Sequence, residues 1–153
     1  MKNDFNDIIK DKAVIVGIGN VLKGDDALGP ALIEKIKDEV DAVCIDAGST
    51  PENYIGKIIK LQPDVVLLVD ACHIERSPGE HEILTKDDIL KTGFTTHDLS
   101  PVMFIEHLES ETKADIYLLA VQPEGVAFGD EMSDSVKKAI EEIADWIKEA
   151  YNA

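Results

Sequence analysis

Four side chains in this sequence have the types and positions needed for chemistry: Asp25, Asp26, Asp70 and His97. The carboxylates come after apolar runs, and His97 lies in a loop before a predicted helix. In parallel α/β sheets, the loops at the carboxyl ends of the strands form one rim, where ligands bind. Two carboxylates and an imidazole are suitable ligands for a borderline divalent ion such as nickel, zinc, iron or manganese. Three protein ligands leave coordination positions open for substrate or water.

Each of these side chains also has a structural interpretation. Asp25 and Asp26 precede a predicted helix, so either could cap it or interact favourably with its dipole. His97, taken alone, is typical of a hydrogen-bonded loop histidine. An acid such as Asp70, at the end of the most apolar strand, must be paired, solvated in a cleft or bound to a ligand. The predicted meeting at one rim favours a functional role for these side chains taken together. Of the two adjacent acids, Asp25 is the one more expected to shape the loop.

Other potential ligands are assigned structural roles. Cys72 follows Asp70 by two residues and would bind nickel or zinc as a thiolate, but a lone intracellular cysteine is more often a small buried hydrophobe. Three further histidines lack partners at metal-binding spacing and are expected to be surface or structural residues: His73, His81 and His107.

The elements that must position these residues alternate between strand and helix patterns. Glycines follow an apolar β-branched run at 14–16, which predicts the first strand, and further strands are predicted at 42–46, 65–69 and 116–121, with an added edge strand at 82–85. Helices are predicted from Leu28 to Val40 on a one-sided apolar stripe with Pro30 in the first turn, at 52–61, from Pro101 to about 108, and after a cap near Ser133. Residues 1–12 form either a short packing helix or a loosely docked end. This order predicts a single α/β domain over 1–153, with a largely parallel twisted sheet of about five strands and helices on both faces.

Composition limits the partners. The chain has 153 residues and a net charge of −16, which repels nucleic acid and anionic membrane surfaces. Its apolar runs are far shorter than the ~20 residues that span a bilayer, so no membrane insertion is expected. Neither Cys44 nor Cys72 belongs to a C-x-x-C pair, and no cleavable leader is recognisable. We therefore expect a cytoplasmic protein.

Two familiar motifs do not fit. The run Gly17-Ile-Gly19-Asn-Val-Leu22 has leucine where a dinucleotide-binding fingerprint needs its third glycine, and the acids that follow repel phosphate. A phospho-receiver domain also combines acids after its first strand with an aspartate after its third. Here, however, the last strand ends in Gln122-Pro123, with no lysine to contact a phosphoryl group.

The ordered set of motifs resembles the hydrogenase maturation endopeptidases, most closely the branch serving membrane-bound or energy-converting nickel-iron hydrogenases. The resemblance extends from about Val14 to past Gly129. The matching segments are Gly17-Ile-Gly-Asn20, Asp25-Asp26 with Gly29-Pro30, Asp46-Ala-Gly-Ser-Thr-Pro-Glu-Asn53, Val69-Asp-Ala71, Thr95-Thr-His97 and Gln122-Pro123.

This resemblance implies an endopeptidase that removes the C-terminal extension of a nickel-loaded nickel-iron hydrogenase large-subunit precursor. On the matching positions, Asp26, Asp70 and His97 are the implied catalytic and metal-contacting residues, with Asp26 where some members carry glutamate. The implied nickel is supplied by the substrate, not held by the free enzyme. We expect a monomer whose partner is the precursor. The alternative is a non-catalytic nickel-binding or assembly module that uses the same residues.

Overall fold

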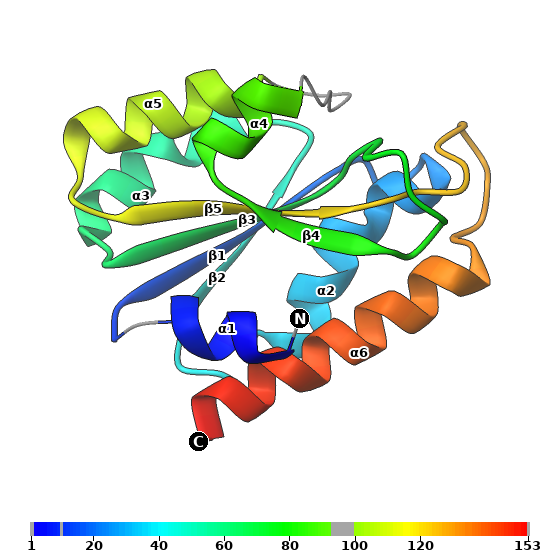
Figure 1. The fold of residues 1–153 in the computed structure, drawn as a ribbon, viewed down its shortest axis with the longest axis horizontal. Helices are drawn as coiled ribbons and strands as arrows, with labels where there is room; N and C mark the ends of the chain where they lie inside the picture. Colours follow the sequence, from blue (N-terminus) through cyan, green and yellow to red (C-terminus); the bar gives the residue numbers. More distant parts are fainter. Residues whose placement is uncertain (1, 10, 93–99, 153) are drawn as a thin grey trace.

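The computed structural model describes residues 2–9, 11–92 and 100–152, which form a five-stranded sheet (Figure 1). The order of the described strands is β2-β1-β3-β5-β4, and β4 pairs antiparallel with β5 while the other pairs are parallel. The strands are β1 (Ala13–Ile18), β2 (Val43–Gly48), β3 (Val65–Ala71), β4 (His81–Leu84) and β5 (Asp115–Val121). The predicted parallel sheet and its added edge strand are confirmed.

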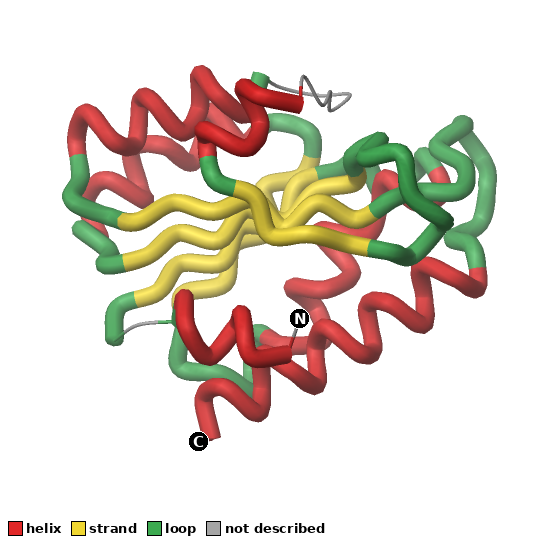
Figure 2. Tube along the Cα trace, viewed as in Figure 1, coloured by secondary structure: helices red, strands yellow, loops and turns green. Residues whose placement is uncertain are grey.

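Helices cover both faces of the sheet, as predicted (Figure 2). One face carries α1 (Lys2–Ile8), α2 (Leu28–Ile36) and α6 (Asp134–Asn152); the other carries α3 (Ile55–Leu61), α4 (Lys86–Thr92) and α5 (Pro101–Glu111). Two 3-10 turns, η1 (Gly24–Ala27) and η2 (Pro51–Tyr54), directly precede α2 and α3.

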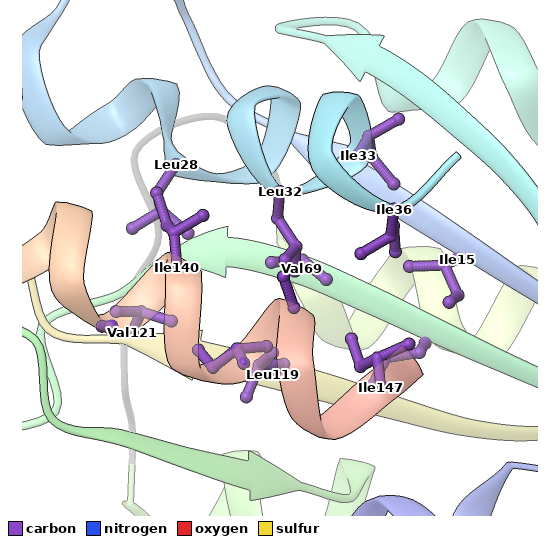
Figure 3. Packing of buried hydrophobic residues seen from close by; sticks show 14 of the residues in the cluster. Ile15, Leu28, Leu32, Ile33, Ile36, Val69, Leu119, Val121, Ile140 and Ile147 are labelled. Carbon is purple, nitrogen blue, oxygen red and sulfur yellow. The ribbon is translucent and has the colours of Figure 1, made fainter. Parts of the chain in front are cut away.

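The sheet is stable because its central strands are apolar on both sides. Every residue of β1 and of β3 is buried, so each strand packs helices on both faces. Figure 3 shows one of these layers, where side chains of α2 and α6 meet those of the sheet. Its labelled members are Ile15, Leu28, Leu32, Ile33, Ile36, Val69, Leu119, Val121, Ile140 and Ile147.

The N-terminal segment is a packing helix and not a loosely docked end. Phe5 on α1 is fully buried, and its ring centroid lies 6.4 Å from that of Trp146 on α6. The apolar stripe that begins in α2 continues to Val40, although the helix ends at Ile36. Val40 reaches the same core from the connection to β2, so helical spacing predicts its contact but not its conformation.

The chain reverses its direction across the sheet between β1 and β3. From β1 it passes through α2 to β2 on one side, and the later strands β3, β5 and β4 all lie on the other side. In open α/β sheets, such a switch point leaves a crevice outside the carboxyl ends of the two strands, and ligands bind there. The fold therefore selects the ends of β1 and β3 as the place to look for a site.

Candidate active site

Asp26 and Asp70 both lie at this switch point. Asp70 is the sixth residue of β3, directly after Val69, which pairs with Gly17 of β1. Asp26 belongs to η1, which follows β1 and packs against β3. Both carboxylates are buried, with only 1% of Asp26 and 3% of Asp70 exposed. The predicted meeting of these two acids at one rim is therefore confirmed.

The two carboxylate oxygens of Asp26 differ in their contacts with the described residues. Oδ2 accepts a hydrogen bond from the backbone N–H of Asn20 at 2.8 Å, which closes the loop between β1 and η1. Oδ1 is buried and has no hydrogen-bond partner among the described residues. Leaving a buried carboxylate oxygen unsatisfied costs free energy, and such exceptions in folded proteins require an explanation. A cation or a donor brought by a ligand would satisfy this oxygen.

Three glycines allow the loop to approach the strands. A Cβ on Gly17 would lie 2.4 Å from the carbonyl oxygen of Gly29, and one on Gly29 would lie 2.7 Å from that of Val69. Gly19 has a φ of +148°, and a Cβ there would lie within bonding range of the carbonyl oxygen of Asp26. Glycine at these positions lets η1 and the first turn of α2 sit against the ends of β1 and β3.

We expect Gly19→Ala to displace Asp26 and abolish activity. The new methyl group would occupy the position of the Asp26 carbonyl, at only 1.7 Å from its oxygen, so η1 must move. Overpacking of this kind typically costs about 1–3 kcal/mol. Urea denaturation should show this loss, and Gly56→Ala is the matched control because nothing lies within 4 Å of a Cβ there. A Gly19→Ala protein with wild-type stability and activity would contradict this packing.

Asp25 fastens the β1–η1 loop to the β5–α6 loop. Its Oδ2 accepts hydrogen bonds from the backbone N–H groups of Glu124 (2.7 Å) and Gly125 (3.2 Å) and from the Ser133 hydroxyl (2.9 Å). Its Oδ1 accepts from the Ser133 N–H at 2.7 Å, and the residue is fully buried. Neither Asp25 nor Asp26 caps α2, which has no side-chain cap. The capping interpretation is wrong, and the expected loop-shaping role of Asp25 is confirmed.

Gln122 makes a second connection that sequence reasoning did not assign. Its Oε1 accepts from the N–H of Ile74 at 2.8 Å and of Arg76 at 3.5 Å, while its Nε2 donates to the Pro123 carbonyl at 3.2 Å. The side chain thereby ties the segment after Asp70 to the end of β5. The available signal was a polar residue directly after an apolar strand, the same signal that identified Asp70.

Cys72 is a buried thiol beside Asp70. It is 1% exposed and packs within the apolar cluster on the α5 face of the sheet. Burial, followed by the Asp70 carboxylate, raises the pKa of the Cys72 thiol to about 12. The thiol is therefore protonated near neutral pH, as the interpretation of Cys72 as a small hydrophobe requires.

We expect Cys72→Ala to retain processing activity. The substitution removes one buried sulfur and leaves a small cavity, so a destabilisation of about 1–2 kcal/mol is expected. Thermal unfolding and a processing assay on the same preparation would separate the two effects. Loss of activity in a folded Cys72→Ala protein would show that the sulfur takes part in the reaction.

His97 lies outside the described residues, so its role stays a prediction. The helix after it is as expected: Ser100 accepts from the N–H of Met103 at 3.4 Å, and Pro101 occupies the first turn of α5. Within the described ranges, no group of three or more His, Cys, Asp or Glu residues could hold a metal ion.

The remaining histidines were expected to be surface or structural residues. His73 and His107 are exposed, and His81 on β4 lies 5.7 Å from Trp146 between ring centroids. A surface hollow of about 560 Å³ beside His81, between the β3–β4 segment and α6, is lined by neither Asp26 nor Asp70.

Among the described parts of the chain, no helix has the length and apolar character needed to cross a membrane.

Known proteins are similar to this chain in sequence and in fold. The HycI family model, described as hydrogenase maturation protease, matches residues 27–150, a range that begins directly after Asp26. Hydrogenase 3 maturation protease of Escherichia coli K12 is 36% identical over 133 residues, which cover 85% of each chain.

Solved structures agree with this match. The crystal structure of the [NiFe] hydrogenase maturation protease HycI from Thermococcus kodakarensis has a TM-score of 0.89 and 32% identity, covering 98% of this chain and 99% of that one. The solution structure of the endopeptidase HycI from Escherichia coli has a TM-score of 0.79 and 31% identity, covering 91% and 90%. This chain belongs to the hydrogenase maturation protease family.

Proposed function

We propose that this protein is an endopeptidase that removes the C-terminal extension of a nickel-loaded nickel-iron hydrogenase large-subunit precursor. The observation that carries the proposal is buried Asp26 at the β1–β3 switch point, whose Oδ1 has no hydrogen-bond partner among the described residues, next to the end of the strand that carries Asp70. Membership of a protease family supplies the reaction class.

In this proposal the nickel belongs to the substrate. Asp26, Asp70 and His97 complete its coordination with two oxygens and a nitrogen, a donor set that suits a borderline ion. The enzyme contributes no thiolate, because the substrate contributes cysteines of its own. The substrate's nickel is then both the recognition element and the anchor that holds the scissile peptide at the rim.

Peptide hydrolysis at this rim consumes one water molecule. The water oxygen adds to the scissile carbonyl carbon, the C–N bond breaks, and the leaving nitrogen takes a proton from the attacking water. Activation of that water by the substrate's nickel or by a rim carboxylate lowers the barrier. The products are the mature large subunit with a new carboxyl terminus and the released peptide.

The sequence and its family resemblance support a proposal for the compartment, oligomeric state and partner hydrogenase of this protein. The protein acts in the cytoplasm as a monomer, without membrane insertion or nucleic acid, and serves the branch of membrane-bound or energy-converting hydrogenases. Its described cysteines, Cys44 and Cys72, are free thiols, which is typical of a reducing compartment.

Intact-mass spectrometry of the precursor tests the reaction. Incubation of purified nickel-loaded precursor with this protein is expected to give two products whose masses sum to that of the precursor plus one water. A stable complex in which the precursor keeps its full mass would instead identify a non-catalytic assembly module and overturn the protease proposal.

A further inference from the structure

Exposed apolar side chains gather on the two loops that Asp25 joins. Val21 and Leu22, between β1 and η1, are each 64% exposed, and Phe128, between β5 and α6, is 68% exposed. Over the described ranges, these three are half of the six large hydrophobic residues that are exposed. Clustered exposed apolar residues mark interaction sites, whereas scattered ones need no explanation. We call Val21, Leu22 and Phe128 the apolar rim patch.

The two loops hold the apolar rim patch in one arrangement. The N–H of Gly129, next to Phe128, donates to the carbonyl oxygen of Leu22 at 2.9 Å. The N–H of Leu22 donates to Oδ1 of Asn20 at 2.9 Å, and Nζ of Lys23 lies 4.8 Å from the centre of the Phe128 ring. Figure 1 shows both loops at the same end of the sheet. A surface fixed before binding loses little conformational entropy when a partner docks.

This patch is continuous with the candidate active site. Val21 and Leu22 belong to the loop that Asp26 itself closes through the 2.8 Å hydrogen bond from Asn20 N–H to Asp26 Oδ2. The N–H of Asp26 also donates to the carbonyl oxygen of Lys23 at 3.0 Å. A protein held at Oδ1 of Asp26, the oxygen without a partner among the described residues, therefore lies beside the apolar rim patch.

Charge around the patch restricts the partner further. The loop that carries Phe128 also carries the exposed acids Glu124, Asp130 and Glu131, in a protein with a net charge of −16. A complementary partner segment has apolar side chains flanked by basic ones, because opposite charges increase the rate and specificity of association.

We propose that the apolar rim patch is the docking surface for the large-subunit precursor, and that it receives apolar side chains from the segment beside the scissile bond. Basic residues of that segment face Glu124, Asp130 and Glu131. This inference rests on the proposed function and adds to it the surface that binds the substrate polypeptide independently of its nickel.

Steady-state processing of nickel-loaded precursor tests the docking surface. The double variant Leu22→Ser/Phe128→Ser is expected to raise KM about tenfold or more and to change kcat less than about twofold, since apolar anchors dominate interface energies. The matched control is Val43→Thr/Leu90→Ser, which alters exposed hydrophobic residues at the start of β2 and on α4. Its KM and kcat are expected to equal those of the wild type.

The exposed acids beside the apolar rim patch allow a second, independent test. Glu124→Gln/Glu131→Gln is expected to raise KM about threefold or more in low salt and to lose this effect in high salt, because salt screens exposed charges. Thermal unfolding of every variant checks the fold, and Val21→Ser replaces the double variant if its melting temperature falls.

Several outcomes would overturn the docking surface. One is that the wild type cleaves the precursor and Leu22→Ser/Phe128→Ser has the same KM as the control variant. Another is a fall in kcat at constant KM, and a third is a dimer that the patch variant dissociates without changing KM. A wild type that leaves nickel-loaded precursor uncut is a different result, because it removes the proposed function itself.

Discussion

Asp26→Asn is expected to reduce processing of nickel-loaded precursor by more than about 100-fold while leaving the fold intact. Loss of a residue that only supports a metal ligand typically costs about 10–100-fold, and loss of a direct contact costs more. The asparagine carbonyl can still accept the hydrogen bond that Oδ2 takes from Asn20 N–H, so the loop remains closed. The substitution removes the negative charge and half of the acceptor capacity.

The stability of this variant distinguishes function from folding. Because Oδ1 of Asp26 has no described hydrogen-bond partner, its loss removes no native hydrogen bond among the described residues. We therefore expect a free energy of unfolding within about 1 kcal/mol of the wild-type value. Processing by Asp26→Asn at a wild-type rate would remove Asp26 from the site. The same assay applies to Asp70→Asn and His97→Ala.

Asp25→Asn is expected to have the opposite profile, with its main effect on stability. The Asp25 carboxylate accepts four hydrogen bonds, and an asparagine amide must direct an NH₂ group toward donors in either orientation. Hydrogen bonds to charged groups contribute about 1.5–3 kcal/mol each, so a loss of about 2–4 kcal/mol is expected. Activity then falls because the β1–η1 loop and the β5–α6 loop separate.

Urea denaturation at neutral pH measures this loss. Glu141→Gln, an exposed acid on α6, is the control for removal of one negative charge and is expected to leave stability unchanged. An Asp25→Asn protein within about 0.5 kcal/mol of wild type would show that the hydrogen bonds of Asp25 do not hold the two loops together.

The positions of the rim acids were predictable because they follow from local patterns. An apolar run of β-branched residues predicts a buried parallel strand, and the residue at its carboxyl end must lie at the rim, as Asp70 does. Local patterning and chain direction are sufficient for these features.

The hydrogen bonds that distinguish the two adjacent acids were beyond sequence reasoning. Asp25 bonds to residues 99–108 positions away, and Gln122 bonds to Ile74, 48 positions away. Such pairs become neighbours only after the sheet has formed, so spacing along the chain carries no trace of them. The sequence predicted that Asp25 shapes a loop, but not which second loop it holds. The role of His97 stays a prediction of the family resemblance.

Nickel dependence of cleavage tests the central proposal most directly. One preparation of large-subunit precursor is divided into nickel-loaded and nickel-free portions, each is incubated with this protein, and intact masses are followed over time. We predict loss of a C-terminal peptide from the loaded portion alone, and recovery of cleavage when nickel is inserted into the free portion. Equal rates of cleavage with and without nickel would contradict the proposal that Asp26 and Asp70 recognise the substrate's metal.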